Sequence, residues 1–375
     1  MLLVIIVFLL IFSFVILAHE FGHFIVARKS GVRIDEFGIG YPPRIWGKKI
    51  RGVTYSINWI PFGGFVKIYG ENSEKETLKD SDSFCSKSPK IKAGILLAGI
   101  GANLFVAIIF FYFLLGFHNF QTFQSQFFDY QFPFGQQNDY PMISEVLDGS
   151  PAQEAGINEF DVVIAGNEEY FSNSDELINF IDQNRGEEIT LYLANAHNPN
   201  EEKIVKLVPR IDPPENSGAI GVMLGDVSRL SYQGIPNKAF SGVLHTLNLG
   251  HFTFSALGHL IKISIVEGDI RPLSTSFSGP VGILAFTKLS MAGGVWQLFY
   301  FIAAISLGLA VINILPIPAA DGGRLVFVIY EAIFKKRAPA RVERAVNAFG
   351  MFFLLALFLI ITIKDIIQFK DILIK

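Results

Sequence analysis

The stretch VILAHEFGHFIVARKSG, residues 15–31, places two histidines and a glutamate at the end of an apolar run. Residues 2–18 contain no charged side chain, and with HEFGHFIVA added the segment is long enough to span a bilayer as one helix. Ionisable side chains at mid-membrane cost roughly 2.5–3.5 kcal/mol each on insertion scales, so they indicate function by default. A cleaved signal peptide is the alternative, but no basic segment precedes the apolar run.

The rest of the chain agrees with a membrane protein. Of its 375 residues 51% are hydrophobic, 37 are Phe, and the mean hydropathy is +0.41. Three further apolar runs, at about 93–117, 295–317 and 346–363, bring the expected number of spans to four. The stretch 240–265 is also apolar but contains several polar side chains, so it is interpreted as amphipathic or interfacial helices. These side chains include His245, His251, His259 and Lys262.

The basic residues predict an orientation. Residues 28–92 contain 13 Lys or Arg against 7 acidic residues, whereas residues 118–240 contain 6 against 19. Basic loops remain in the cytoplasm, so the first loop is expected there and the second outside. The loop between the third and fourth spans contains KKRAPARVER and is expected in the cytoplasm, which places both termini outside.

The second loop contains a soluble domain. Its segments predict a strand and short helix in MISEVLDGSPAQEAGI, a strand in DVVIAGNEEY, a helix in SNSDELINFIDQNRG, and two strands joined by HNPN. This order resembles a PDZ domain of the bacterial protease type. Phe160 departs from the pattern, because the family usually has Gly before the strand. With Cys85 as the only cysteine, no intrachain disulfide can form.

The pentapeptide HEFGH fits the pattern H-E-x-x-H. Positions i and i+4 of a helix share one face, so His19 and His23 can reach a single zinc ion. Glu20 lies beside them, where it can take a proton from a water acidified by zinc. The alternative is a set of polar side chains satisfied inside a helix bundle, which the depth of the motif in the membrane disfavours.

A catalytic zinc needs a third protein ligand. The best candidate is in NILPIPAADGGR, residues 313–324, where two prolines and two glycines interrupt the third span. Broken helices in membranes occur only within protein or beside a wet cavity. Asp321 lies near the cytoplasmic end of its span, at the depth expected for His19. The alternative role for Asp321 is a cap of the helix that follows.

These motifs together resemble the site-2 protease family of intramembrane zinc metalloproteases, most closely its bacterial PDZ-containing branch, the regulator-of-sigma-E type. The resemblance rests on HEFGH, NILPIPAADGG, SGPVGI at 278–283, GGFVKIYGE at 63–71 and LAGIGANL at 97–104. It implies that zinc is held by His19, His23 and Asp321, with Glu20 as catalytic base. It also implies that Asn313 and Pro316 help to hold substrate.

Two positions depart from the family pattern. The family usually has Leu-Asp-Gly-Gly-His, whereas this chain has Ala320 before the Asp and Arg324 after the glycines. The family's Ala-Gly-Pro before the Asn of the second span is here Ala-Gly-Ile, with Ile100 in place of Pro. Neither change replaces a residue that the resemblance assigns to catalysis.

The resemblance implies a protease of the bacterial inner membrane that cleaves single-span membrane proteins near the cytoplasmic side, such as anti-sigma factors or remnant signal peptides. Residues 52–70 contain two β-prone runs joined through Pro61, Gly63 and Gly64. We expect the edge of this hairpin to pair with unwound substrate, with Gly63 and Gly64 as binding residues. A plain cytoplasmic hairpin is the alternative. No nucleic-acid site or phosphate loop is evident.

The expected organisation is a polytopic helical membrane protein with an inserted α+β domain. Residues 1–117 form the N-terminal membrane part, with a β-hairpin region at about 31–70. Residues 138–212 form the PDZ domain, 213–290 a connector, and 291–375 the C-terminal membrane part. Histidines outside the motif are expected to be solvated or capping. Two other functions stay open, a silent membrane-anchored PDZ scaffold and a tethered zinc protease with soluble substrates.

Overall fold

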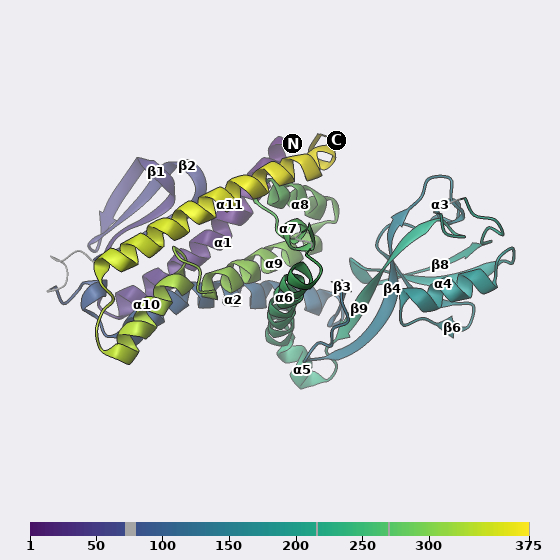
Figure 1. The fold of residues 1–375 in the computed structure, drawn as a ribbon, viewed down its shortest axis with the longest axis horizontal. Coiled ribbons are helices and arrows are strands. Elements are labelled where there is room, and N and C mark those ends of the chain that lie inside the picture. Colours follow the sequence, from purple (N-terminus) through teal and green to yellow (C-terminus); the bar gives the residue numbers. More distant parts are fainter. Residues whose placement is uncertain (72–79, 215–216, 269–270, 375) are drawn as a thin grey trace. The chain divides into compact units, whose positions relative to one another are not determined.

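The computed structural model of the chain describes residues 1–71, 80–214, 217–268 and 271–374. The chain divides into two compact units (Figure 1). The first contains Met1–Phe110 and Thr253–Lys375, and the second contains Phe111–Phe252. The helices α2, Pro89–Phe117, and α6, Ser241–Val266, each begin in one unit and end in the other.

The four predicted spans each correspond to a helix. The first unit contains most of the long apolar helices and several short ones. Their bounds are α1 Leu2–Lys29, η2 Phe84–Ser86, α7 Arg271–Ser276, α8 Pro280–Ala292, α9 Val295–Ile314, α10 Asp321–Phe334 and α11 Ala340–Ile374. Three of the predicted runs fall within α1, α2 and α11, and the third run, about 295–317, extends past the end of α9 at Ile314.

The expected count of four spans is not confirmed. Among the described residues five helices are long and apolar enough to cross a membrane, and α6 is the fifth. The sequence interpretation divided 240–265 into interfacial helices because of its polar side chains. In the structure it is one continuous helix, whose most apolar window has a mean hydropathy of 1.3 against 2.1–3.1 for the other four helices.

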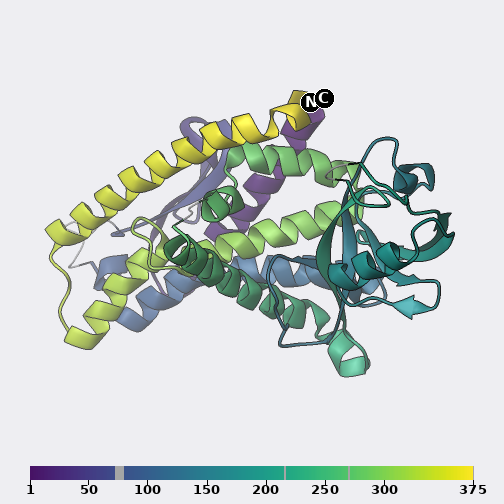
Figure 2. The same cartoon turned by 45° about the vertical axis from the view of Figure 1, so that its right-hand side comes forward.

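The start of α1 and the end of α11 lie at the same end of the first unit in both ribbon views (Figures 1 and 2). Helix α8 contacts both α1 and α11. Asp365 of α11 is buried, and its Oδ2 accepts hydrogen bonds from the backbone amides of Gly279 and Gly282 at 2.7 and 2.8 Å. This carboxylate therefore caps the beginning of α8, which accounts for the SGPVGI motif.

The β-hairpin region is more extensive than the two short runs expected. Strands β1, Ile34–Ile50, and β2, Val53–Ile68, are long and bent. Different segments of the two strands pair with one another, so that some segments are paired on both sides. Residues 34–39 pair with 64–68 on one side and with 54–57 on the other, and 54–57 also pair with 46–49. Among the described residues, the segment 64–68 is therefore an edge, with one of its sides paired to another strand and the other side without a strand partner.

The second unit contains the expected α+β sheet. The predicted strands and helices of the soluble domain are present in the predicted order. The strands are β3 Gln121–Gln126, β4 Gln136–Val146, β5 Asp161–Gly166, β6 Glu169–Tyr170, β7 Ile189–Asn195, β8 Asn198–Leu207 and β9 Val222–Ser231. The helices are α3 Pro151–Glu154, α4 Ser174–Gln183 and α5 Ile235–Ala239.

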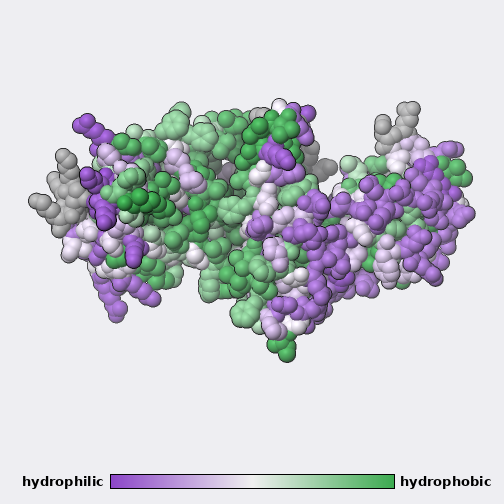
Figure 3. All heavy atoms as spheres, turned by 60° about the horizontal axis from the view of Figure 1, so that its bottom comes forward, coloured by the Kyte–Doolittle hydropathy of each residue, from purple (hydrophilic) through white to green (hydrophobic). Residues whose placement is uncertain are grey.

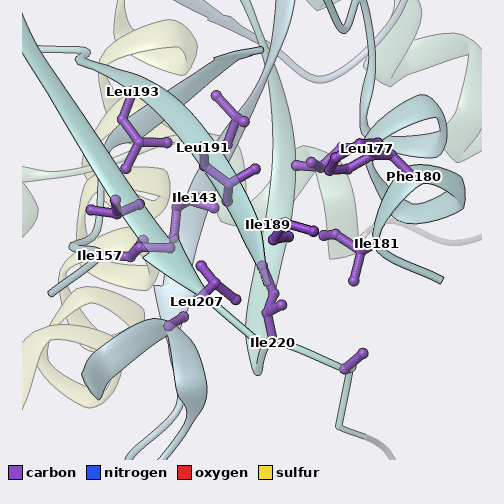
Figure 4. Close-up of a cluster of buried hydrophobic side chains, with 14 of the residues drawn as sticks. Ile143, Ile157, Leu177, Phe180, Ile181, Ile189, Leu191, Leu193, Leu207 and Ile220 are labelled. Atoms are coloured by element: carbon purple, nitrogen blue, oxygen red, sulfur yellow. The ribbon is translucent and has the colours of Figure 1, made fainter. Parts of the chain in front are cut away.

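The strand order is β3-β9-β4-β5-β7-β8, with β6 paired to β5. Aliphatic side chains from β4, β7 and β8 meet those of α4 in a buried core (Figure 4). Side-chain oxygens cap two helices of this unit, since Ser150 accepts from the Gln153 amide and Asn173 from the Glu176 amide.

Phe160, which replaces the usual Gly, has a φ of 68° in the left-handed region. Its backbone is fixed on both sides, because its amide donates to Ile143 O and its carbonyl accepts from the Ala196 amide. Its ring lies 4.7 Å from that of His197, centroid to centroid. The turn thus keeps the conformation that Gly would favour, at a steric cost that the neighbouring contacts offset.

The surfaces of the two units differ in character. Figure 3 shows mainly hydrophobic residues over the helices of the first unit and mainly hydrophilic residues over the sheet of the second. Large apolar side chains of α11 illustrate this, since Phe349, Phe352 and Phe358 are all more than half exposed. Contiguous apolar surface of this kind is typical of a protein that contacts lipid.

Candidate metal centre

His19 and His23 lie on one face of α1 and are both buried, with 7% and 6% of their surfaces exposed. Their Nε2 atoms are 3.1 Å apart. Asp321 completes a triangle, because its Oδ2 lies 2.9 Å from His19 Nε2 and 3.1 Å from His23 Nε2. The structure thus brings together all three residues that the sequence proposed as ligands.

Asp321 reaches the histidines because the chain breaks between α9 and α10. Helix α9 ends at Ile314, and α10 begins at Asp321, so the predicted interruption of the third span is confirmed. The two glycines after Asp321 leave no room for a side chain. A Cβ on Gly322 would lie 2.0 Å from Leu315 O, and one on Gly323 would lie 2.3 Å from Ile317 O. The loop therefore folds directly onto the first turn of α10.

The triangle fits a metal ion. Among the described residues it is the one group of three or more histidine, cysteine or acidic side chains whose ligand atoms converge in this way. Zinc binds imidazole nitrogen and carboxylate oxygen at about 2.0–2.1 Å, so neighbouring ligand atoms of a tetrahedral site are about 3.3 Å apart. The observed edges of 2.9–3.1 Å are close to that value. Three ligands leave a fourth position for water or substrate.

Helix α2 holds both histidines from behind, which sequence reasoning missed. His23 Nδ1 lies 2.8 Å from Ile95 O, and His19 Nδ1 lies 3.3 Å from the Asn103 amide nitrogen. Gly99, which lies between Ile95 and Asn103 on α2, approaches the rings so closely that a Cβ there would lie 2.4 Å from His23 Nε2. The motif LAGIGANL could have indicated this contact, since it combines glycines with an amide in a helix facing the histidines.

Glu20 faces the β-hairpin region. Its Oε2 accepts a hydrogen bond of 3.0 Å from the Val66 amide, on the unpaired side of the segment 64–68. A cavity of about 190 Å³ lies here, lined by the three proposed metal ligands, by Glu20 and by this edge. Its lining residues are His19, Glu20, His23, Tyr41, Gly64, Phe65, Val66, Ile68, Glu71, Ile95, Leu96, Asp321 and Arg324.

Of the four residues that the sequence proposed for substrate binding, one lines this cavity. Gly64 lines the cavity, whereas Gly63, Asn313 and Pro316 are absent from the described residues that line it. Asn313 is in the last turn of α9 and Pro316 is in the loop before α10. Arg324, where the family has His, donates to the Glu71 carboxylate, and both side chains line the cavity.

Two buried histidines outside the motif, His118 and His245, hydrogen-bond within the fold. His118 is buried and bonds Leu114 O through Nδ1 at 3.0 Å, so it caps the end of α2 as expected. His245 is fully buried, and its Nδ1 lies 3.0 Å from Tyr232 Oη, so the expectation of a solvated or capping group is wrong there. The prediction failed because α6 packs its first half against the second unit's own side chains.

Residues 7–357 match the sequence model of "Peptidase family M50". Proteins from Clostridium perfringens and Clostridium acetobutylicum are 32% and 30% identical, over 96% and 97% of this chain and 97% of each relative. A Rickettsia conorii protein is 29% identical, over 96% of this chain and 97% of its own length. All three carry the description "Putative zinc metalloprotease".

Among solved structures, the PDZ domain of the SdrC-like protein from Listeria monocytogenes aligns with 25% of this chain and 93% of its own. The identity is 16% and the TM-score is 0.20.

Proposed function

The chain belongs to peptidase family M50, and from this premise we propose that it is an intramembrane zinc metalloprotease that cleaves transmembrane segments of single-span membrane proteins. The family's relatives are described as zinc metalloproteases, so zinc is the cofactor. One observation carries the proposal. The triangle of His19, His23 and Asp321 is built on helices of the membrane part, and beside it lies the strand edge 64–68, whose outer side has no strand partner among the described residues.

The proposed roles follow from the contacts. Bound at the triangle, zinc supplies Lewis acidity, which polarises a carbonyl oxygen and acidifies water. Glu20 accepts the proton of the attacking water at its carboxylate and later donates it to the leaving amine. The Val66 amide holds this carboxylate in place. Asp321 adds a negative charge, so the site binds a divalent cation more tightly than the two neutral imidazoles would bind it alone.

The segment 64–68 would bind the substrate. A transmembrane helix hides its amides in its own hydrogen bonds, so it must unwind before hydrolysis, and in lipid each freed amide needs a new partner. An unpaired strand edge offers such partners by strand addition. Gly64, Val66 and Ile68 line the cavity from this edge. The natural substrates would be of the anti-sigma-factor or remnant-signal-peptide type.

The decisive experiment measures zinc and cleavage together. The full chain is purified in detergent or lipid, its zinc content is determined by elemental analysis, and a model single-span substrate is offered. Mass spectrometry of the products should locate the cut inside the transmembrane segment. A chain that binds zinc without cutting any such substrate would favour the silent scaffold. Cleavage restricted to soluble peptides would favour the tethered protease.

We also propose four crossings, with α6 in the outer interface. Both ends of the chain lie at the same end of the first unit, which fits an even number of crossings. The first half of α6 is tied to the second unit, since Asn248 bonds both the amide and the carbonyl of Phe134. The remaining residues, 253–266, span only about 21 Å at 1.5 Å per residue, less than the roughly 30 Å of a hydrocarbon core.

Cysteine labelling tests this topology. Cys85, the only cysteine, is replaced by Ser, and single cysteines are placed at Glu267, Asn200 or Lys336. A membrane-impermeant maleimide applied from outside should label positions 267 and 200 but not 336. Labelling of position 267 only after the membrane is opened would mean that α6 crosses. Labelling of position 336 from outside would reverse the proposed orientation, with the second unit outside and the metal centre near the cytoplasm.

The sheet domain of the second unit is proposed to be a PDZ-type filter that excludes substrates with bulky outer domains. Strands β3 and β9 pair with its other strands, so we propose that it extends beyond 138–212 to residues 121–231. The Tyr232 amide donates to Phe120 O at 2.9 Å, so a short linker can replace 121–231. The deletion should permit cleavage of an untrimmed substrate. Loss of cleavage of trimmed substrate, with zinc retained, would indicate a docking domain instead.

A further inference from the structure

The outer hydrogen bond of His23 determines which of its nitrogens can bind metal. Its Nδ1 lies 2.8 Å from Ile95 O, and a carbonyl oxygen only accepts. Nδ1 therefore carries the hydrogen, and Nε2 presents its lone pair towards Asp321 Oδ2. The backbone of α2 thus fixes the metal-binding tautomer of one histidine, as outer partners of ligating histidines commonly do.

His19 needs the same arrangement but faces a side chain instead of a carbonyl. Its Nδ1 lies 3.3 Å from the amide of Asn103, which is fully buried. An amide group can donate through Nδ2 or accept through Oδ1, and a half-turn about its last bond exchanges the two. If Nδ2 donates, the hydrogen of His19 lies on Nε2, which then has no lone pair for a metal.

The hydrogen bonding of Asn103 itself favours the other orientation. With Nδ2 towards His19, the Oδ1 of Asn103 is buried without a hydrogen-bond partner among the described residues. A buried acceptor without a donor costs about 1–3 kcal/mol. Turning Oδ1 towards His19 gives this oxygen the Nδ1–H as its donor. The same turn places the Nε2 lone pair of His19 towards Asp321, matching the tautomer of His23.

We propose that Asn103 is a positioning residue of the metal centre, whose amide oxygen accepts the Nδ1–H of His19 and so holds that ring in its metal-binding tautomer. The inference rests on the proposed ligand set. Asn103 is itself held from α9, because Ser306 Oγ donates to its backbone carbonyl at 3.0 Å. The three helices α1, α2 and α9 are therefore joined at this point, and α2 supplies the outer acceptor for both histidines.

Three variants test the proposal on the purified full chain. Asn103→Leu keeps the size of the side chain but removes the acceptor, and should weaken zinc binding by about 10–100-fold. Asn103→Asp cannot donate but accepts as a carboxylate, so it should bind zinc as tightly as the wild type or more tightly. Thr287→Val is the control, because Thr287 is fully buried in α8 and, among the described residues, its hydroxyl donates to the Ile283 carbonyl of its own helix.

The readouts are zinc affinity, measured by competition with a chromogenic chelator, and the visible absorption of the cobalt-substituted protein. Asn103→Leu should alter the cobalt spectrum, whereas Asn103→Asp and Thr287→Val should preserve a four-coordinate spectrum. Wild-type affinity and spectrum in Asn103→Leu would overturn the proposal. Weak binding in Asn103→Asp would also overturn it, because it would show that the amide donates, and this arm decides even if the Leu variant does not fold.

The proposed function can fail separately. A wild-type chain that binds no zinc, or whose zinc affinity is unchanged by His19→Ala, would remove the ligand set itself. A wild-type chain that needs His19 for zinc, with Asn103 variants unaffected, would overturn only the positioning role.

Discussion

The Val66 amide donates a hydrogen bond of 3.0 Å to the Glu20 carboxylate, and this bond joins the edge of a β-sheet to the residue beside the two histidines. Glu20 therefore has a fixed position before any substrate binds. The same amide belongs to the edge that would pair with substrate, so the proposed base and the proposed binding strand are parts of one unit.

Glu20→Gln separates proton transfer from zinc binding. The amide oxygen of Gln can still accept from Val66 and leaves the three ligands in place, but it cannot take a proton. Zinc should remain at one ion per chain, while turnover should fall about 100- to 10,000-fold. Elemental analysis and cleavage of a model transmembrane substrate measure the two effects. Glu145→Gln, an exposed carboxylate of β4, is the matched control. Wild-type turnover in Glu20→Gln would contradict the assignment of the base.

Asp321→Asn should affect zinc itself. The substitution keeps an oxygen at the third corner of the triangle but removes its negative charge, which stabilises a divalent cation in a buried site. We expect zinc affinity and cleavage to fall together, by tenfold or more. Chelator competition beside the cleavage assay measures both. Full occupancy and full activity would show that the third ligand lies elsewhere and that Asp321 serves only as part of the first turn of α10.

The sequence predicted the ligand triangle because each ligand belongs to a local pattern. His19 and His23 share a helix face by spacing, and Asp321 follows a break that two prolines enforce. Strands β4, β5, β7 and β8 were predictable from local pattern and turn residues, whereas β3 and β9 lie outside the expected domain and were not predicted. That Asp321 should meet the two histidines was inferred from matching membrane depth and from the family resemblance, and the structure brings the three side chains together.

The contacts that were missed all depend on residues far apart in the chain. Asn103 and His19 are 84 positions apart, and no local pattern indicates that an amide in one helix faces a ring in another. Segment 34–39 lies within the expected β-hairpin region, but its pairing on both sides, with 64–68 and with 54–57, was not predicted. Residues 240–265 were interpreted as interfacial helices because of their polar side chains. In the folded chain two of these side chains have partners, since His245 bonds Tyr232 and Asn248 bonds Phe134.

Gly99→Ala is expected to damage the metal centre without weakening its helix. A Cβ at this position would lie 2.4 Å from His23 Nε2 and 2.8 Å from His19 Cε1, closer than real contacts allow. Alanine favours a helix over glycine by about 1 kcal/mol, so the thermal stability of α2 should not fall. Zinc content should drop below one tenth of the wild-type value by elemental analysis. Gly101→Ala is the control, since nothing lies within 4 Å of its Cβ. Equal zinc in the two variants would contradict the close approach.

Asp365 is expected to contribute to the stability of the fold and not to catalysis. Its Oδ2 accepts from two amides at the beginning of α8, and its Oδ1 lies 3.1 Å from Lys364 Nζ. Asp365→Leu leaves these buried donors without their acceptor and should reduce the free energy of unfolding by about 2–4 kcal/mol. Asp365→Asn keeps an acceptor oxygen and should lose less. Unfolding in detergent measures both. An unchanged unfolding midpoint in Asp365→Leu would show that the cap contributes no stability.

The strand-addition hypothesis is best tested on the substrate. Substitutions of Gly63 or Gly64 are unsuitable, because Gly63 has a φ of 69° and a Cβ on Gly64 would lie 2.5 Å from a Leu17 methyl carbon and 2.8 Å from Gly38 O. Such variants would deform the hairpin, so their loss of cleavage would not isolate the pairing. An ester in place of one substrate amide removes a single donor and keeps the shape of the chain.

In a paired strand, alternate residues present their backbone groups to the same edge. If substrate adds to the segment 64–68, esters at every second position near the cut should slow cleavage, and esters at the positions between should not. Each lost hydrogen bond is worth about 0.5–1.5 kcal/mol, so each sensitive position should lose about 2- to 10-fold in kcat/KM. The same peptides serve as controls for one another, because every ester also weakens the substrate helix. A uniform effect along the peptide would therefore report only helix unwinding, and would show that the free edge beside Glu20 does not bind substrate as a strand.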